Sequence, residues 1–513
     1  SIADFCLQTA NMTHNESALR QLVKNRRFWV TAAAISSVAL ICYDWYSDRF
    51  ASPSTRYMRI KEDYAISTTK LRQICKAFVR EMEVGLSEDD QLAQSQKKSN
   101  LKMLCSHIYG VPAGDEQGIF YTLDWGGSNY RVLRIAFPAE KRGAPDTTEF
   151  KIKIEQQYQH ADNAQVLFDY LSQHLQQQIA KNESDKNSVL VPVGFTFSFP
   201  MTQPRLDSGI LLEWTKGFDI PDVVGKDVVQ LMHASFANHA IDAKIYAVCN
   251  DTVGTLLAAA YDHENARVGL IIGTGTNACY IEPSLAKPDA PDHGLIINIE
   301  WGNYAKLLPR KPTDLIMDAH TPNPGVQFAE KMISGYYIGE LVRLLTLEVF
   351  REKITDFGAQ TPLNEPWQFK SPVVSDILAK YTTGDLNGVV QILHGNALNT
   401  FDVNDADIFA KLCVLIVNRS ADLAATLLLG TLQKTGLYTC TRKDDRNPFE
   451  QDRFELMAEY RKDTHKKVTV GIDGSVYQHV PGYAQRMREC MRRVVGAEIE
   501  SRVVMVHSSD GSG

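Results

Sequence analysis

The chain has 513 residues, of which 44% are hydrophobic and 22% charged, and this ordinary globular composition excludes disorder over most of it. Its 54 Lys and Arg against 61 Asp and Glu give a net charge of −7, and no long basic run is present, so we predict no nucleic-acid partner. The nine cysteines are dispersed and never spaced CxxC. We interpret them as reduced intracellular thiols rather than as a disulfide framework or a zinc site.

The first segment with a marked pattern is residues 28–43, FWVTAAAISSVALICY, which carries no charged residue and follows Lys24, Arg26 and Arg27. A membrane-spanning helix needs about 20 apolar residues, so this run is short for one. A buried core helix and a signal peptide are the alternatives. Aromatic residues bracket the run, as is typical of a membrane interface. We therefore predict a membrane anchor at 28–43 within an N-terminal tail of residues 1–50.

From residue 67 the pattern predicts alternating helices and strands. The first helix begins near Ser67 and Thr68, and apolar residues at helical spacing form its core face: Leu71, Ile74, Cys75, Phe78, Val79 and Met82. Further helices are predicted at 161–183, 252–261, 326–351, 370–381, 404–434 and 483–494. Strands are predicted at 189–199, 245–248 and 468–472. Two strand–turn–strand hairpins, at 118–135 and 267–282, have turns rich in glycine and small hydroxyl residues.

The turn of the first hairpin belongs to the segment DWGGSNYR, residues 124–131. Glycine lets backbone N–H groups approach phosphate oxygens with no side chain in the way. The remaining polar groups could donate to phosphate, supply positive charge or hold Mg²⁺ through water. An ordinary β-turn remains an equal alternative. The candidate phosphate-binding residues are Asp124, Gly126, Gly127, Ser128, Asn129 and Arg131.

The turn of the second hairpin, GTGTNA at residues 273–278, matches the GxGxxA dinucleotide fingerprint. A dinucleotide-binding turn must open a helix, whereas Cys279-Tyr280-Ile281 continues as a strand. We therefore predict a phosphate-binding hairpin rather than a dehydrogenase site. The sequence contains no GxxxxGK[ST] motif, which excludes P-loop kinases.

Other polar residues suit a sugar site. Asp251 follows a short strand and opens a helix, where an Asp is either a helix N-cap or a general base. Ser198 and Thr215 lie at strand ends among aromatic residues, as expected for a sugar with apolar faces and polar rims, although either could be a turn hydroxyl. Glu300 and Glu330 are solvated surface residues unless they join this site.

In this order, several segments resemble the hexokinase family from about residue 67 to the end: GFTFSFP, WTKGF, NDTVGTLLAAAY, GLIIGTGTNACYIE, EWG, EKMISGYY and VGIDGSVY. The segment beginning LRQICKAFVREMEVGL is most similar to plant-type hexokinases, which also carry N-terminal membrane anchors. The resemblance implies an α/β fold, the two-lobed actin-like ATPase (ribonuclease H-like) fold. Each lobe would have a mixed five-stranded sheet and flanking helices, with a cleft between residues 55–245 and residues 246–513.

The resemblance also implies MgATP-dependent phosphorylation of a hexose, most of all glucose, at its 6-hydroxyl. Asp251 would take the hydroxyl proton and Lys216 would stabilise the transferring phosphoryl group. The implied sugar-binding residues are Ser198, Thr215, Lys216, Asn250, Asp251, Asn277, Glu300, Gln327 and Glu330. Besides the first turn, Thr274 would bind ATP phosphates, and Gly474 and Ser475 would lie near the adenosine. We expect a monomer on the cytoplasmic face of the mitochondrial outer membrane or another organelle, or otherwise in the cytosol.

Three departures from the family pattern stand out. Trp125 replaces the usual Leu, where it would crowd either the lobe interior or the phosphate site, and Ser128 replaces Thr. Asn303-Tyr304-Ala305 replaces AFG after EWG. The chain begins at Ser1 and stops at residues 509–513, which open the family's final strand–turn–helix, so we expect an incomplete sequence. A non-catalytic glucose sensor and a membrane-docked scaffold are the rival functions.

Overall fold

The computed structural model describes residues 51–87, 99–126, 129–183, 190–214, 218–286, 294–353, 361–441, 457–459 and 467–508. The predicted anchor at 28–43 lies outside these residues, as do Gly127, Ser128, Thr215 and Lys216. The chain divides into two units, residues 1–63 and 64–513. The described part of the first unit forms helix α4 (Pro53–Tyr64), and the elements below belong to the second.

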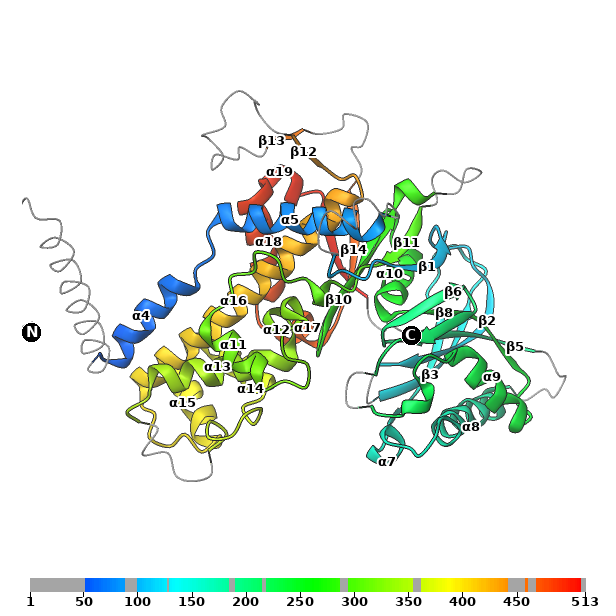
Figure 1. Cartoon of the computed structure of the whole chain (residues 1–513), viewed down its shortest axis with the longest axis horizontal. Helices are drawn as coiled ribbons and strands as arrows, with labels where there is room; N and C mark the ends of the chain where they lie inside the picture. Colours follow the sequence, from blue (N-terminus) through cyan, green and yellow to red (C-terminus); the bar gives the residue numbers. More distant parts are fainter. Residues whose placement is uncertain are drawn as a thin grey trace, which may run out of the picture. The chain divides into compact units, whose positions relative to one another are not determined.

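One mixed sheet has five strands in the order β4-β3-β2-β5-β8. The strands are β2 (Gly118–Trp125), β3 (Asn129–Phe137), β4 (Asp146–Lys153), β5 (Val191–Phe197) and β8 (Ala243–Cys249). β2, β3 and β4 pair antiparallel, while β5 is parallel to both β2 and β8. Helices α8 (Ala164–Asn182) and α9 (Val228–Asn238) lie side by side (Figure 1), and their apolar faces share one buried cluster with the strands. The predicted first hairpin and both further strands of this region are confirmed.

A second mixed sheet has six strands rather than the expected five, in the order β1-β11-β10-β9-β14-β15. They are β1 (Leu104–Tyr109), β9 (Ala266–Ile272), β10 (Thr276–Glu282), β11 (Leu295–Asn298), β14 (Val468–Asp473) and β15 (Val503–His507). β9 and β10 pair antiparallel, which confirms a hairpin in place of a dinucleotide-binding strand–turn–helix. β1 pairs with β11 although it precedes the first sheet in sequence. The division into lobes 55–245 and 246–513 therefore stays a prediction.

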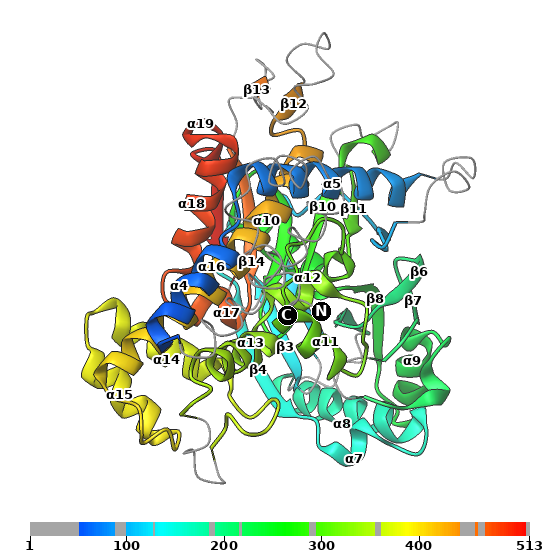
Figure 2. The ribbon, with the colours of Figure 1, turned by 60° about the vertical axis from the view of Figure 1, so that its left-hand side comes forward.

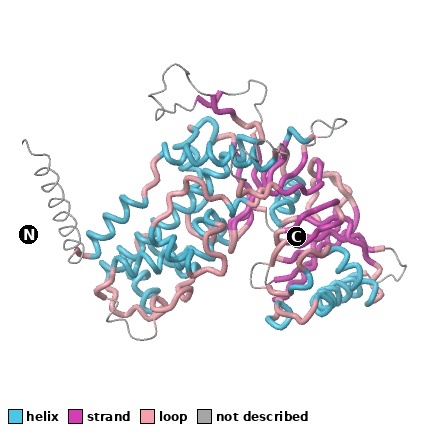
Figure 3. Tube along the Cα trace, viewed as in Figure 1, coloured by secondary structure: helices cyan, strands magenta, loops and turns pink. Residues whose placement is uncertain are grey.

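Most helices gather to one side of the strands, as the colouring of Figure 3 shows. They are α5 (Thr68–Leu86), α10 (Asp251–Asp262), α11 (Pro312–Ala319), α12 (Phe328–Ile333), α13 (Gly335–Val349), α14 (Ser371–Thr382), α15 (Leu386–Gly395), α16 (Val403–Lys434), α17 (Ser475–His479), α18 (Tyr483–Val495) and α19 (Ala497–Glu500). Of these, α10, α12 and α17 pack against the second sheet. Shorter elements are α7 (Gln156–Gln159), β6 (Met201–Arg205), β7 (Ser208–Leu211), β12 (Thr439–Thr441) and β13 (Met457–Glu459). α16 packs against α5 and α18 (Figure 2). Of the described helices, α16 alone is long and apolar enough to cross a membrane, but 78% of its most apolar stretch is buried inside the protein.

The predicted start of α5 is confirmed: Ser67 is its N-cap, and the Ser67 side chain accepts a hydrogen bond from the Lys70 N–H. All six residues of the predicted core face are buried. The prediction of one helix at 326–351 is wrong, because the chain is extended at Ser334 and divides into α12 and α13. The N–H groups of Gly335 and Tyr336 donate instead to the carbonyls of Gly273 and Thr274. The start of α13 is thereby joined to the β9–β10 turn.

Candidate active site

Asn250 and Asp251 occupy the junction between β8 and α10. Asn250 is the N-cap of α10, and its Oδ1 accepts from the N–H of Thr252 at 3.0 Å and from the Thr252 hydroxyl at 2.8 Å. Asp251 is the first residue of the helix, and its Oδ1 accepts from the same Thr252 N–H at 2.9 Å. The partial positive charge of a helix N-terminus stabilises a carboxylate there. The capping role falls to Asn250, and Asp251 lies half-buried at the first position of the helix.

A partly buried amide–carboxylate cluster lies beside this junction. The Asn277 amide nitrogen donates to Asn250 Oδ1 at 3.3 Å, to Asn298 Oδ1 at 2.9 Å and to Glu300 Oε1 at 3.0 Å. Asn298 in turn donates to Glu300 Oε1 at 2.9 Å. Asn298 is a site residue that the sequence reasoning missed. Its signal was a polar residue closing the apolar strand LIIN, two positions before Glu300, and β10–β11 pairing brings it next to Asn277.

Glu330 reaches the same region from α12. Its Oε2 accepts from the N–H of Thr276, the residue before Asn277, at 3.2 Å. A side chain at Gly275 would meet this oxygen, since a Cβ there would lie 2.8 Å from it. Glu300 and Gln327 both adopt the left-handed backbone conformation, with φ of 56°. Such strain in non-glycine residues persists only where surrounding contacts hold it, and it concentrates at functional sites.

Ser198 follows β5, next to the end of β8. Its N–H donates to the Trp125 carbonyl at 3.2 Å, which keeps the chain beyond β5 alongside β2. A Thr196–Cys249 contact of 3.9 Å joins the ends of β5 and β8 in the same way. The parallel pairing of these strands thus places Ser198 on the edge of the sheet from which Asn250 extends.

The first glycine turn connects β2 to β3. The Gly126 N–H donates to the Asn129 carbonyl at 3.1 Å, which closes the turn. Arg131 binds the buried Asp124 carboxylate through Nε at 2.8 Å and through a second nitrogen at 2.5 Å. The two predicted phosphate-site charges therefore meet as an ion pair, and their contacts with nucleotide or Mg²⁺ stay a prediction.

Trp125 is fully buried in the cluster of apolar residues between the first sheet and helices α8 and α9. Successive strand residues point to opposite faces, so Trp125 lies on the other face of β2 from Asp124. Its ring packs 5.3–5.9 Å from an aromatic group made of Phe168, Phe197, Phe199, Trp214 and Phe218. The sequence left open whether Trp125 would crowd the lobe interior or the phosphate site, and the structure supports the interior position.

Replacing Trp125 by Leu, the residue usual in the family, is expected to destabilise the protein by about 2–4 kcal/mol. The smaller side chain leaves a cavity inside the aromatic group, and the surrounding rings can close it only in part. Urea unfolding followed by tryptophan fluorescence measures the change. Turnover per folded molecule should stay within about threefold, and a tenfold gain would show instead that the indole obstructs the nucleotide.

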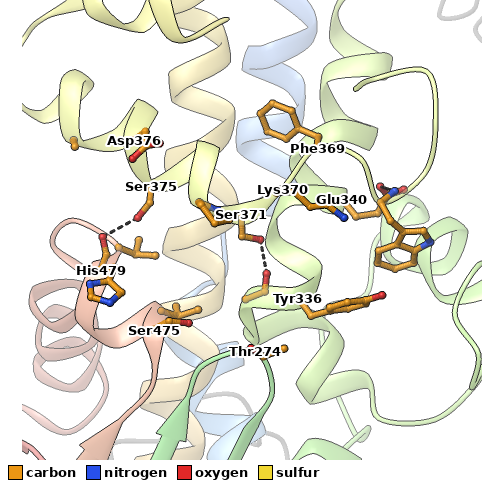
Figure 4. Close-up of a pocket in the computed structure, with 16 residues that line it drawn as sticks. Thr274, Tyr336, Glu340, Phe369, Lys370, Ser371, Ser375, Asp376, Ser475 and His479 are labelled. Carbon is orange, nitrogen blue, oxygen red and sulfur yellow. Dashed lines mark hydrogen bonds between the residues drawn. The ribbon is translucent and has the colours of Figure 1, made fainter. Parts of the chain in front are cut away.

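A pocket of about 550 Å³ lies beside the second glycine turn. Thr274 and Ser475 line it, together with residues of α14 (Figure 4). The Ser375 hydroxyl donates to the His479 carbonyl at 2.7 Å, and the rings of Tyr336 and Trp367 stack at 5.4 Å as another part of the wall. This volume suits a nucleoside. The pocket thus unites two predicted nucleotide residues that lie 201 positions apart (475 − 274).

Gly474 is required where β14 turns into α17. Its φ is +116°, and a Cβ there would lie 2.5 Å from the backbone of Ile272. The chain before Ser475 therefore passes directly against the end of β9, where the second glycine turn begins. The role of Gly474 near the adenosine was predicted from the family resemblance and stays a prediction.

Two thiols lie next to the cluster. Cys249 precedes Asn250, and Cys279 donates to the Thr252 carbonyl at 3.1 Å. Desolvation inside the protein raises the pKa of both thiols to about 12. They stay protonated at neutral pH, which argues against a cysteine nucleophile because the thiolate is the reactive form.

Family models, related sequences and a solved structure all relate the chain to proteins described as hexokinases. Two family models, both described as hexokinase, match residues 56–261 and 267–513. The chain is similar to "Hexokinase-2" of Solanum tuberosum, at 32% identity over 94% of each chain. It is 34% identical to "Hexokinase-4, chloroplastic" of Oryza sativa subsp. japonica, over 86% of this chain and 83% of the relative. The solved structure of a hexokinase from Schistosoma mansoni complexed with glucose covers 90% of this chain and 98% of its own, at 28% identity and a TM-score of 0.74.

Proposed function

The chain belongs to the hexokinase family, and from this premise we propose that it transfers the γ-phosphoryl group of ATP to the 6-hydroxyl of a hexose, with glucose as the preferred sugar. Its α/β architecture is the two-lobed actin-like ATPase fold of that family. The observation that carries the proposal is the hydrogen-bonded cluster of Asn250, Asn277 and Glu300 beside Asp251. Amides and carboxylates held in this way, out of full contact with water, match sugar hydroxyls and penalise analogues that lack them.

Asp251 acts as the general base in this proposal. The carboxylate takes the proton as the sugar oxygen attacks phosphorus, from its position at the N-terminus of α10. Phosphoryl transfer asks mainly for alignment and neutralisation of charge. Lys216, predicted to stabilise the transferring group, lies outside the described residues, so its role rests on the family pattern.

The nucleotide binds in the pocket between the second glycine turn and α14. Tyr336, Ser371 and Ser475 line this cavity and would hold the base and ribose, and Thr274 of the second turn would contact the phosphates. Mg²⁺ takes oxygen ligands and keeps much of its water, so it arrives with the ATP phosphates. Asp124 already pairs with Arg131, which supports a contact with the ion through water rather than a direct bond.

The direct test is ADP release from MgATP with and without glucose. Glucose-dependent turnover supports the proposal, and glucose binding without ADP release would favour a non-catalytic sensor.

Deleting residues 1–48 tests the proposed anchor at 28–43: the shortened protein should leave the membrane fraction with its activity unchanged. Fractionation of cell membranes also shows whether the full chain is on the mitochondrial outer membrane or in a plastid. The name of the rice relative, "Hexokinase-4, chloroplastic", gives a plastid as the location of that protein. Gel filtration of the shortened protein tests the proposed monomer.

Replacing Asn298 by Leu is expected to weaken glucose binding by about tenfold or more. The change removes one of the three acceptors of the Asn277 amide nitrogen and one of the donors to Glu300, so both site groups lose part of the contacts that orient them. Isothermal titration with glucose measures the loss. The Michaelis constant for ATP should remain unchanged, and an equal rise in both constants would contradict a sugar-site role.

A further inference from the structure

Lys331 is a buried cation that the reaction itself does not use. It follows Glu330 on α12, and its side chain is 1% exposed. Its Nζ donates to Asp318 Oδ1 at 2.5 Å, to the Thr321 hydroxyl at 2.9 Å and to the Asn323 carbonyl at 2.7 Å. An ammonium group has three N–H donors, so every donor of Lys331 is used.

These three acceptors lie within residues 318–327, which comprise the end of α11 and the loop that follows it, are held around the ammonium, and are called the 318–327 loop below. Asp318 Oδ2 also accepts from the Gly325 N–H at 2.9 Å, and the Thr321 hydroxyl donates back to the Asp318 carbonyl at 2.7 Å. Asn323 donates from its amide to Gln327 Oε1 at 2.5 Å. The loop thus ends at Gln327, whose left-handed backbone needs such support.

Two predicted sugar-binding residues depend on this arrangement. Gln327 ends the loop and is the N-cap residue of α12, while Glu330 precedes Lys331 and contacts the Thr276 N–H. We propose that Lys331 is a positioning residue for the hexose: through the 318–327 loop it fixes Gln327 and Glu330, and so sets affinity for the sugar but not for the nucleotide. This inference rests on the proposed function.

The simplest rival explanation is a buried ion pair that only stabilises the fold. The chain offers a matched control in Arg343 and Glu340 on α13, which pair at 2.7 Å with side chains 6% and 3% exposed. Glu340 also accepts from the Trp367 N–H at 2.8 Å, and Trp367 lines the nucleotide pocket. The two pairs are similarly buried, but each supports a different pocket.

The experiment compares Lys331→Met with Arg343→Met in the full chain, using glucose titration calorimetry and the Michaelis constants for glucose and ATP. Lys331→Met should weaken glucose binding about tenfold or more, because the residues that hydrogen-bond the sugar are displaced. The Michaelis constant for ATP should stay within about twofold of the wild-type value. Arg343→Met should instead raise the Michaelis constant for ATP and leave glucose binding nearly unchanged. Equal changes in both constants for Lys331→Met, or no change in glucose affinity, would overturn the inference.

A milder variant covers the case in which Lys331→Met does not fold. Thr321→Val keeps shape but removes one acceptor of the ammonium, and it should weaken glucose binding in the same direction. A double-mutant cycle of Thr321→Val with Gln327→Ala should be non-additive for glucose, because both act through one loop. Additive losses would refute the coupling. If the wild-type protein binds glucose without turnover, the kinase proposal is refuted, but these binding tests still decide the role of Lys331. If the wild-type protein binds no hexose, both proposals are refuted.

Discussion

Replacing Asp251 by Ala is expected to lower kcat for glucose phosphorylation by at least about 10², the range typical for loss of a general base. The sugar hydroxyl then has no carboxylate at the start of α10 to take its proton. The loss of stability should be small, about 0.3–1 kcal/mol, because Asn250 and not Asp251 is the N-cap of the helix. Coupled measurement of ADP release under saturating glucose and ATP gives the change in kcat.

Asp262, at the other end of α10, provides the matched control. It is exposed, and Asp262→Asn removes the same charge from the same helix without touching the site. Its kcat should stay within about twofold of wild type. If Asp251→Ala keeps more than a tenth of the wild-type kcat, another group takes the proton and the proposed mechanism is wrong.

Replacing Gly269 by Ala is expected to destabilise the protein by about 3 kcal/mol and to reduce activity as well. A Cβ at this position of β9 would lie 2.1 Å from the Thr252 carbonyl and 2.9 Å from Leu256 Cβ. The first of these is helix backbone, which cannot rotate out of the way. α10 must therefore move off the sheet, and Asp251 moves with it. Denaturant unfolding measures the stability, and glucose titration measures the site.

Gly395→Ala is the control for that substitution. Gly395 is the last residue of α15, and apart from its chain neighbours and the backbone of its own helix no atom lies within 4 Å of the position that its Cβ would take. Alanine is the better helix former by about 1 kcal/mol, so this change should be neutral or mildly stabilising. An effect of Gly269→Ala no larger than that of Gly395→Ala would show that α10 adapts freely to the sheet.

Local patterns predicted much of the fold because each lies within one element. The helical spacing of apolar residues from Leu71 to Met82 gave the buried face of α5, and the glycine-rich turns gave both hairpins. The family resemblance also predicted Asn250, Asn277 and Glu300, which hydrogen bonds of the Asn277 amide join beside Asp251. The same reasoning missed Asn298, because an amide at a strand end has no distinctive spacing, and its importance appears only when β11 pairs with β10.

Sequence patterns alone were enough to predict most of the long helices, the two glycine turns and the family to which the chain belongs. The contacts between groups far apart in the sequence required the tertiary structure. It placed β1 in the second sheet, ended α12 at Ser334 by joining the start of α13 to the Gly273 carbonyl, and enclosed Lys331 within its loop. The physical reason is that hydrophobic periodicity is read over a few consecutive residues, whereas strand partners and buried donors are fixed by packing across the whole chain.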